Sequence, residues 1–396
     1  MDKKMIKYVG ILVGLIILLV LFLVLKNAVN GGAKYSYPDI EKKLVAAAKK
    51  YTKDFPGTLP TTPNTSFSVS ARVLADKEYI KDISDYAKDD VICNGSVEVF
   101  MTTSGNYNYV PELICGNKYE TKKLANKVIE DNDYGTVNGS GLYEKVNGRF
   151  TTSYNQLGQN SNTDDFEYVF RGDDVNNYVQ IDDNLWRIVS IKGDNNMLLI
   201  YTGYIQKGSA YDDRYNEEVN KYQGVNIYEQ NGIRSRAMEQ AEAFYNGTVV
   251  LKDRIKYSEK TKYLTTTMDL CMGKRSTTDT DISGRIECRT ILQDQYVGLL
   301  PAYYYMEASL DPSCTTIVSK NCGNYNYLSK FNDYWWLLTG NSENTNEAYN
   351  VSQRNAQSTL CNQKSYIRPI IMLGSRATYE SGSGTLSDPY IVKYFE

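Results

Sequence analysis

NLWRIVSIKGDNNMLLIY, residues 184–201, consists of two apolar runs separated by the polar segment GDNN. In the first run both alternating sets of side chains are largely apolar, with Trp186 and Ile188 on one face and Leu185 and Val189 on the other. Successive side chains of a strand point to opposite faces, so a strand that is apolar on both faces is expected to be buried on both. The segment GDNN is typical of a turn. The stretch therefore predicts a central strand followed by a second strand.

Shorter runs of the same kind surround this pair. FEYVFRG and NYVQI precede it, and both are rich in β-branched and aromatic residues. Gly and Asp clusters separate the runs, and such clusters favour turns. The sequence therefore predicts an antiparallel meander in this part of the chain.

Two aromatic clusters follow toward the C-terminus, within QYVGLLPAYYYMEASLD and YWWLLTG. Exposed aromatic rings stack on sugars and peptide side chains, whereas buried rings fill a core. Both interpretations are open at this point. The candidate ligand-binding residues are Tyr303, Tyr304, Tyr305, Tyr334, Trp335 and Trp336.

Together with NNYVQIDDNLWRIVSI and YIRPIIMLG, these runs occur in an order that resembles a family of bacterial surface proteins. The C-terminal domains of that family have a C-type-lectin-like fold, distantly similar to formylglycine-generating enzymes. The resemblance covers residues 166–396 and implies an α+β domain that presents a ligand-binding surface. Enzymes of the wider group use reactive cysteines that bind copper. Because the cysteines here fall in pairs, we do not transfer catalysis or a cofactor.

The part of the chain before residue 126 has a different pattern. IEKKLVAAAKKYTKDF has apolar residues at helical spacing with lysines opposite, and SVEVFMTTSGNYNYVPELICGN alternates like a β-hairpin. With the apolar run that precedes them, these elements resemble a pilin-like module over residues 27–125. Prepilins carry a Glu at the fifth mature position, but here Gly10 is followed five positions later by Leu15, which counts against processing. Residues 126–165 are rich in Asn, Gly and Ser, and we expect a linker or long loop there.

Residues 8–25 form an uncharged apolar run that would span roughly 27 Å as a helix, close to the hydrocarbon thickness of a bilayer. A cleaved signal peptide is the alternative, but the residues after the run match a cleavage site poorly. Lysines flank the run on both sides, with more before it, which favours a cytoplasmic segment at residues 1–7. We therefore expect a single-pass signal anchor in a bacterial cell membrane with an extracellular C-terminal region.

The seven cysteines suggest disulfide bonds, and six of them form pairs that are close in sequence. Zinc binding is the alternative, but the chain has no His and no Cys-x-x-Cys spacing, so we expect no metal site. Cys361 has no expected partner. The predicted disulfide cysteines are Cys93 with Cys115, Cys271 with Cys288, and Cys314 with Cys322.

Composition restricts the classes of function. The chain has 396 residues, 42% of them hydrophobic, and its formal net charge is −3, so nucleic acid is not an expected partner. The absence of His removes the commonest general base. A glycosidase with two carboxylates is compatible with the sequence, but no pair of acids stands out. We therefore expect a protein that is not an enzyme and has no cofactor.

Two short motifs and one arginine have structural explanations. RGDD, starting at Arg171, contains an integrin-recognition tripeptide, but Gly and Asp are also typical of a turn. TDTDISG, containing Asp279 and Asp281, lacks the further ligands of an EF-hand calcium loop, and we expect an ordinary loop. Arg368, in an apolar run, is expected to be a structural arginine with a carboxylate partner.

The sequence thus predicts an α+β protein with a transmembrane helix, a helix-plus-hairpin module and a β-rich C-type-lectin-like domain. The expected function is non-catalytic binding of a glycan or protein at the cell surface. The alternatives are a pilin-like assembly subunit and an enzyme that acts on wall or host polymers.

Overall fold

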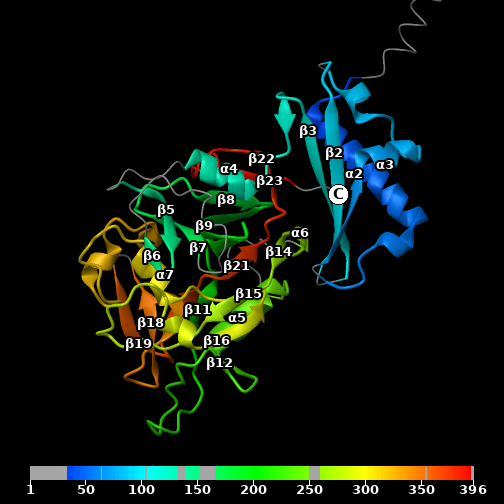
Figure 1. Cartoon of the computed structure of the whole chain (residues 1–396). Helices are drawn as coiled ribbons and strands as arrows, with labels where there is room; N and C mark the ends of the chain where they lie inside the picture. The colour runs from blue at the N-terminus through cyan, green and yellow to red at the C-terminus, as the bar shows by residue number, and fades with distance from the viewer. Residues whose placement is uncertain are drawn as a thin grey trace, which may run out of the picture. The chain divides into compact units, whose positions relative to one another are not determined.

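The structure is a computed structural model that describes residues 34–63, 65–88, 90–102, 105–132, 139–150, 166–248, 259–352 and 355–393. The contacts between residues divide the chain into two units (Figure 1). Unit 1 is Met1–Thr121 with Phe395–Glu396, and unit 2 is Lys122–Tyr394.

Unit 1 packs one long helix against an antiparallel sheet. The helix α2 (Tyr37–Asp54) begins at the cap Ser36, whose hydroxyl accepts a hydrogen bond from the backbone of Asp39. Its apolar stripe, which includes Ile40 and Leu44, is fully buried. The sheet has the order β1 (Ser66–Ser70), β2 (Cys93–Met101), β3 (Tyr107–Cys115) and β4 (Tyr119–Glu120). The short helix α3 (Ala71–Asp76) and the 3-10 helices η1 (Pro56–Thr58) and η2 (Ile83–Tyr86) complete the unit.

Unit 2 is built around the hairpin β9 (Asn184–Lys192) and β10 (Met197–Tyr201), which form the quoted stretch. The strand β9 pairs with β10, β7 and β8, which confirms the prediction that it is central. Trp186, Ile188 and Val189 are almost completely buried, so both faces of β9 are covered. This strand therefore organises the main core of the unit.

The hairpin belongs to a ten-stranded sheet. Its main path runs in the order β14 (Thr265–Thr266), β21 (Ile370–Leu373), β10, β9, β7 (Phe166–Arg171), β5 (Gly141–Val146) and β6 (Arg149–Phe150). Three further strands lie off this path, namely β8 (Tyr178–Ile181), β22 (Thr378–Ser381) and β23 (Tyr390–Lys393).

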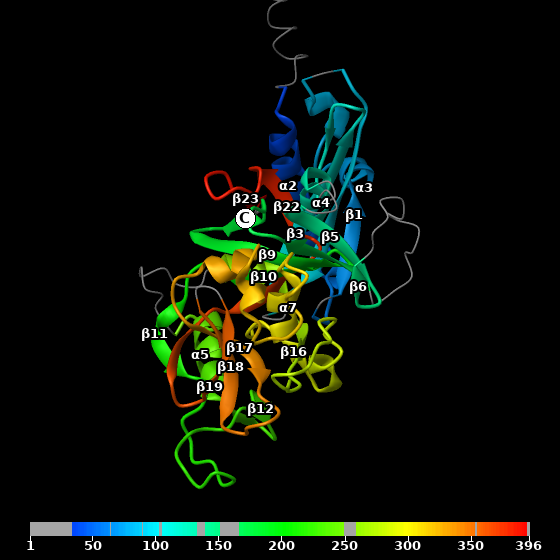
Figure 2. The same cartoon turned by 90° about the vertical axis from the view of Figure 1, so that its left-hand side faces the viewer.

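A five-stranded sheet is the second layer of unit 2. Its order is β11 (Ile205–Ala210), β20 (Lys364–Ile367), β17 (Trp335–Gly340), β18 (Glu347–Val351) and β19 (Ala356–Leu360). Two further sheets have two strands each and pair β12 (Glu229–Gln230) with β13 (Ile233–Arg234), and β15 (Met268–Cys271) with β16 (Ile291–Gln295). The helices are α4 (Leu124–Asp131), α5 (Arg236–Tyr245), α6 (Glu259–Leu264) and α7 (Ala302–Glu307), and the 3-10 helices are η3 (Glu287–Arg289), η4 (Lys320–Gly323) and η5 (Tyr327–Lys330). The helix α7 lies between the two sheets, as Figure 2 shows.

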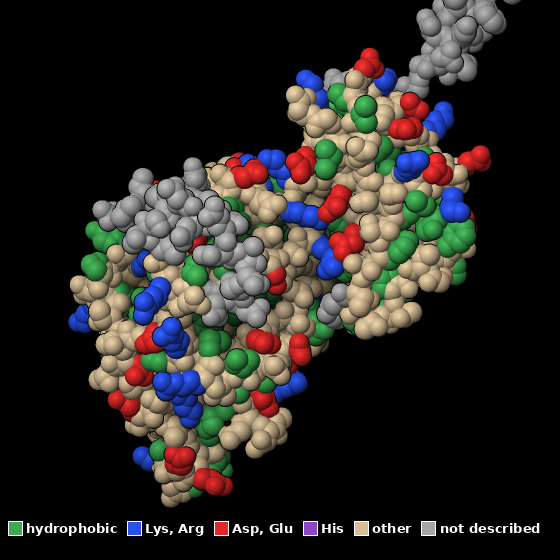
Figure 3. Space-filling view, viewed as in Figure 1, with side chains coloured by type: hydrophobic (Ala, Val, Ile, Leu, Met, Phe, Trp, Pro, Cys, Tyr) green, Lys and Arg blue, Asp and Glu red, His purple; other side chains and the backbone are tan. Residues whose placement is uncertain are grey.

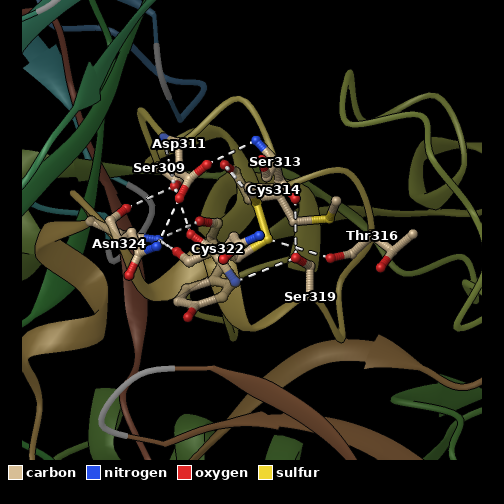
Figure 4. The surroundings of a disulfide bond; sticks show 12 residues. Ser309, Asp311, Ser313, Cys314, Thr316, Ser319, Cys322 and Asn324 are labelled. Carbon is tan, nitrogen blue, oxygen red and sulfur yellow. Dashed lines mark hydrogen bonds between the residues drawn. A yellow bond between two sulfur atoms is a disulfide. The ribbon is translucent and has the colours of Figure 1, made fainter.

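Three disulfides close local loops and confirm the predicted pairs: Cys93–Cys115, Cys271–Cys288 and Cys314–Cys322. The first joins residues that face each other across β2 and β3. Figure 4 shows the third, in a loop where the Asp311 carboxylate accepts hydrogen bonds from the Ser313 backbone and the Asn324 side chain, at 2.8 and 2.7 Å. Cys361 is a buried free cysteine.

The predicted α+β fold class is wrong, because the described residues form a β-rich structure with 23 strands and six α-helices. Aromatic and β-branched side chains favour strands, and they fill most of the apolar runs of unit 2.

No helix within the described ranges is long and apolar enough to cross a bilayer. This finding contradicts the expected single-pass localisation with a cytoplasmic N-terminus and an extracellular C-terminal region. Residues 1–7 and the predicted span, residues 8–25, lie outside the described residues.

The boundary between the units falls after Thr121, close to the expected end of the proximal module. The segment 126–165, expected to be a linker or loop, contains the end of α4 and the strands β5 and β6. These strands join the large sheet through pairing of β5 with β7. Residues 133–138 and 151–165 lie outside the described residues.

A buried ion pair fixes the loop that contains TDTDISG. The guanidinium of Arg275 is fully buried and donates to both carboxylate oxygens of Glu287, at 2.8 and 3.0 Å. It also donates to the backbone carbonyls of Asp279 and Asp281, at 3.3 and 2.6 Å. The Asp281 carboxylate accepts from the backbone and hydroxyl of Ser283. These bonds hold the backbone of the loop in place.

We predict that Arg275→Met destabilises the protein by about 3–5 kcal/mol, because the Glu287 carboxylate would stay buried without its partner. Urea unfolding followed by tryptophan fluorescence measures the change, since all three tryptophans lie in unit 2. The exposed Arg285 gives the matched control Arg285→Met, expected within about 0.5 kcal/mol of the wild type. Equal stabilities of the two variants would contradict the prediction.

Candidate functional site

A cavity of about 240 Å³ lies in unit 2. One wall is apolar and includes Phe166, Leu198, Met268, Ile370 and Met372. Five ionisable side chains also line the cavity and make another part of its surface polar: Lys145, Glu167, Lys192, Tyr303 and Tyr304. A cavity with an apolar wall and a few convergent polar groups is typical of a small-molecule site.

Sheet register brings three of the charged residues together. Lys145 in β5 lies opposite Glu167 in β7, and Glu167 lies opposite Lys192 in β9. Residues that are directly opposite in an antiparallel sheet place their side chains on the same face. The Nζ atoms of Lys145 and Lys192 lie 2.9 and 2.5 Å from the two carboxylate oxygens of Glu167. We call this row of Lys145, Glu167 and Lys192 the charged ladder.

The helix α7 covers the charged ladder with two further groups. The Tyr304 hydroxyl donates to Glu167 at 3.0 Å and accepts from Lys192 at 2.6 Å. Glu307, three positions later on the same helix, is fully buried and lies 2.6 Å from Lys145. The Glu307 Oε2 atom has no hydrogen-bond partner among the described residues. The cluster therefore contains two cations and two acids, one of which is incompletely compensated.

The two acids have opposite pKa shifts. Burial opposes ionisation of Glu167, but the charges of Lys192 and Lys145 outweigh it and lower the pKa of Glu167 to about 2. Burial, reinforced by the charge of Glu167, raises the pKa of Glu307 to about 7, although Lys145 and Lys192 act in the other direction. Burial lowers the pKa values of both lysines, and their acid partners more than offset it, so both are raised.

These shifts determine the charge beside the cavity. When Glu307 is ionised, two lysines balance two carboxylates and the cluster is neutral. When Glu307 is protonated, the cluster carries one net positive charge. Burial raises the pKa values of Tyr303 and Tyr304 well above their usual range, so both phenols stay neutral. The site can therefore change its charge close to neutral pH.

The structure places five of the six candidate residues from the sequence in the core, which was one of the two interpretations left open, and their role in ligand binding stays a prediction. Tyr303, Tyr304 and Tyr305 are buried in α7, because this helix is enclosed between the sheets. Trp335 and Trp336 are fully buried in β17, which has neighbours on both sides. The remaining residue, Tyr334, is exposed.

Two of these aromatic residues nevertheless belong to the cavity, since Tyr303 and Tyr304 line it. The charged residues that line the cavity with these tyrosines were not predicted from the sequence, and the reasons differ. Lys145 fell in the expected linker, and Glu167 and Lys192 fell in predicted strands without a recognisable motif. The available signal was the presence of charged residues in strands expected to be buried, as in FEYVFRG.

The RGDD motif has a structural role. The Nε and Nη2 atoms of Arg171 donate to the backbone carbonyls of Glu307 and Ser309, both at 2.7 Å. Its guanidinium also lies 4.1 Å from the centre of the Phe150 ring. Arg171 therefore holds the end of α7 in place, next to the acid of the cluster.

Acidic and basic side chains are interspersed on the face shown in Figure 3, in keeping with the formal net charge of −3. No family model matches the chain, and no curated protein or solved structure shows significant similarity to it.

We predict that Glu307→Gln stabilises the protein increasingly as the pH rises from about 4.5 to 7. The pKa of Glu307 is about 7 in the folded protein, against an ordinary value of 4.5. The folded state therefore binds this proton more tightly, and the wild type loses stability across that window, whereas Gln cannot ionise. The difference should grow by on the order of 1–3 kcal/mol and then level off.

Urea unfolding between pH 4 and 8 measures this difference. Glu380 is exposed, and Glu380→Gln is the matched control. A stability difference between Glu307→Gln and the wild type that does not change with pH would contradict the shift.

Proposed function

We propose that unit 2 is a binding module whose cavity holds a small molecule with an apolar body and an anionic group. The observation that supports this proposal is the presence of two ammonium groups, Lys145 and Lys192, beside an apolar wall in one cavity. Lys192 is the more accessible of the two, because 34% of its side chain is exposed against 5% for Lys145.

The ammonium group of Lys192 has one N–H donor that makes no hydrogen bond to the described residues. It carries three N–H groups, and its hydrogen bonds go to Glu167 and Tyr304. A carboxylate or similar anion in the cavity would accept the third. Charge-assisted hydrogen bonds of this kind are about twice as strong as neutral ones. Lys192 is thus the group that we expect to bind the anionic end of the ligand.

The other end of the ligand would contact the apolar wall. Phe166, Leu198 and Met372 supply apolar surface there, and burial of such surface contributes roughly 25 cal/mol per Å². The volume of about 240 Å³ is slightly below the usual range for ligand pockets, so a small molecule fits the site better than an oligosaccharide or a protein loop.

An acid–base enzyme is the second candidate, because the opposite pKa shifts of Glu167 and Glu307 are a pattern also found in active sites. Glu307, however, does not line the cavity and lies behind Lys145. Glu167 is already bonded to two lysines and a tyrosine. The arrangement therefore supports binding better than proton transfer to a ligand. An assembly role for unit 1 stays a separate prediction.

We predict that the protein binds benzoate and that Lys192→Met weakens this binding by about 10- to 100-fold, since the charged hydrogen bond is lost. Benzamide, which has the same shape without the charge, should bind the wild type weakly and Lys192→Met equally. Isothermal titration calorimetry measures both. Lys364 is exposed on β20, and Lys364→Met is the control for loss of one positive charge. Equal benzoate affinities of the two variants would exclude the cavity as the site.

We also predict that benzoate binds more tightly at pH 6 than at pH 8, although the ligand is ionised at both. Protonated Glu307 leaves the charges of Lys145 and Lys192 less balanced, so an anion is attracted more strongly. The same titrations with Glu307→Gln should show little dependence on pH. If that variant keeps the pH dependence of the wild type, another group is responsible.

A further inference from the structure

Two buried arginines of unit 2, Arg187 and Arg368, lie near each other without a carboxylate partner. Arg187 belongs to β9, Arg368 lies between β20 and β21, and 7% and 4% of their surfaces are exposed. The strand register brings them together, because Arg187 lies opposite Ile200 of β10 and Ile200 lies opposite Ile370, two residues after Arg368. The Arg187 guanidinium carbon lies 4.5 Å from the centre of the Tyr327 ring. Burial raises the pKa of Tyr327, and the charges of both arginines oppose this rise. We call Arg187 and Arg368 the arginine pair.

The expected carboxylate partner of Arg368 is not found within the described part of the chain. Arg187 likewise has no acid partner there. The neighbours of both guanidinium groups are aromatic rings. Arg187 lies 4.4 Å from the centre of the Tyr178 ring, and Arg368 lies 4.7 and 4.8 Å from the centres of the Phe331 and Trp335 rings. Stacking uses the faces of a guanidinium and leaves its in-plane N–H groups for hydrogen bonds.

Those N–H groups are mostly unused. The Nε atom of Arg187 donates to the Asn177 side chain at 2.8 Å, and the Nε atom of Arg368 donates to the Tyr201 carbonyl at 3.1 Å. Neither arginine makes a further hydrogen bond to the described residues. The Tyr327 hydroxyl and the Trp335 indole N–H are also buried without a partner there. Donors thus outnumber acceptors around the pair.

The pair also lacks compensation for its charge. A buried cation is costly unless an anion or several acceptors surround it. Burial lowers the pKa of Arg187, and burial together with the charge of Arg187 lowers the pKa of Arg368 to about 9. Both guanidinium groups therefore remain cationic at neutral pH, in a place where no described side chain supplies a negative charge.

We propose that the arginine pair binds a small oxyanion, such as a carboxylate, sulphate or phosphate group, between its two guanidinium groups. A planar guanidinium matches two oxygens of an oxyanion through parallel N–H donors. The anion would balance the charges and accept the unused hydrogen bonds. Tyr178 and Phe331 are only partly buried, so the site borders the surface. The site shares no residue with the cavity, so this proposal does not depend on the proposed function.

The loop that carries Tyr327 is held firmly. The side chain of Asn326 donates to the carbonyls of Tyr305 and Cys322, both at 2.8 Å, and accepts from the backbone of Leu328. Cys322 itself is joined to Cys314 (Figure 4). The bonds of Asn326 to this disulfide-closed loop and to α7 therefore hold Tyr327 in place before an anion arrives, which reduces the entropy lost on binding.

Isothermal titration calorimetry of the whole protein with sodium sulphate tests the proposal. The wild type should bind about one sulphate per chain, and Arg368→Met should weaken the binding by about 10- to 100-fold. Arg289 is exposed in the same unit, and Arg289→Met should bind within about twofold of the wild type. Lys192→Met, which alters the cavity, should keep its affinity for sulphate at this site.

A second measurement needs no variant, and it guards against misfolding of Arg368→Met. In ¹H–¹⁵N spectra of the wild type, the Nε signals of Arg187 and Arg368 should shift together and saturate during a sulphate titration. The proposal is overturned if these signals do not move, or if Arg368→Met and Arg289→Met bind sulphate equally. In either case the aromatic rings alone would stabilise the pair.

Discussion

The burial of both faces of β9 is the constraint on which the rest of unit 2 depends. Its apolar residues, such as Trp186 and Ile188, are covered on each side, and its backbone pairs with three other strands. A strand in this position can hold a charged side chain only if the surroundings compensate it. β9 nevertheless carries Arg187 and Lys192, and of these two only Lys192 has an acid partner among the described residues.

Lys192 is compensated by charge. The register of three neighbouring strands places Glu167 between two lysines, and Tyr304 and Glu307 complete the cluster. Arg187 is stabilised by aromatic rings, with Asn177 as its only hydrogen-bond partner among the described residues. Around Lys192, the net charge of the cluster depends on whether Glu307 is protonated. Around Arg187, several N–H groups of the guanidinium have no acceptor among the described residues. The proposed cavity site follows from the first property, and the proposed oxyanion site follows from the second.

The parts of the fold that depend on local pattern were accessible from sequence. The two apolar faces of NLWRIVSI indicated a central strand, and the spacing of six cysteines indicated three local disulfides. The aromatic clusters were ambiguous, because Tyr and Trp suit both cores and recognition surfaces. Only the tertiary structure encloses α7 between two sheets and surrounds Trp335 and Trp336 in β17.

The candidate site was less accessible than the fold. Lys145, Glu167 and Lys192 come from three strands, and the register that aligns them is set by pairing over long distances in sequence. The environment of Arg368 also depends on distant segments, which supply aromatic rings instead of the expected carboxylate. A charged residue inside an apolar strand marks a position that needs a partner, but the sequence alone does not identify that partner.

The most direct test of this account is an NMR titration of the Glu307 side-chain carboxyl carbon, with and without benzoate. The account predicts a midpoint near pH 7 in the free protein and a higher midpoint when the anion occupies the cavity, because bound negative charge favours the protonated acid. A midpoint near the ordinary value of 4.5 that benzoate leaves unchanged would contradict it.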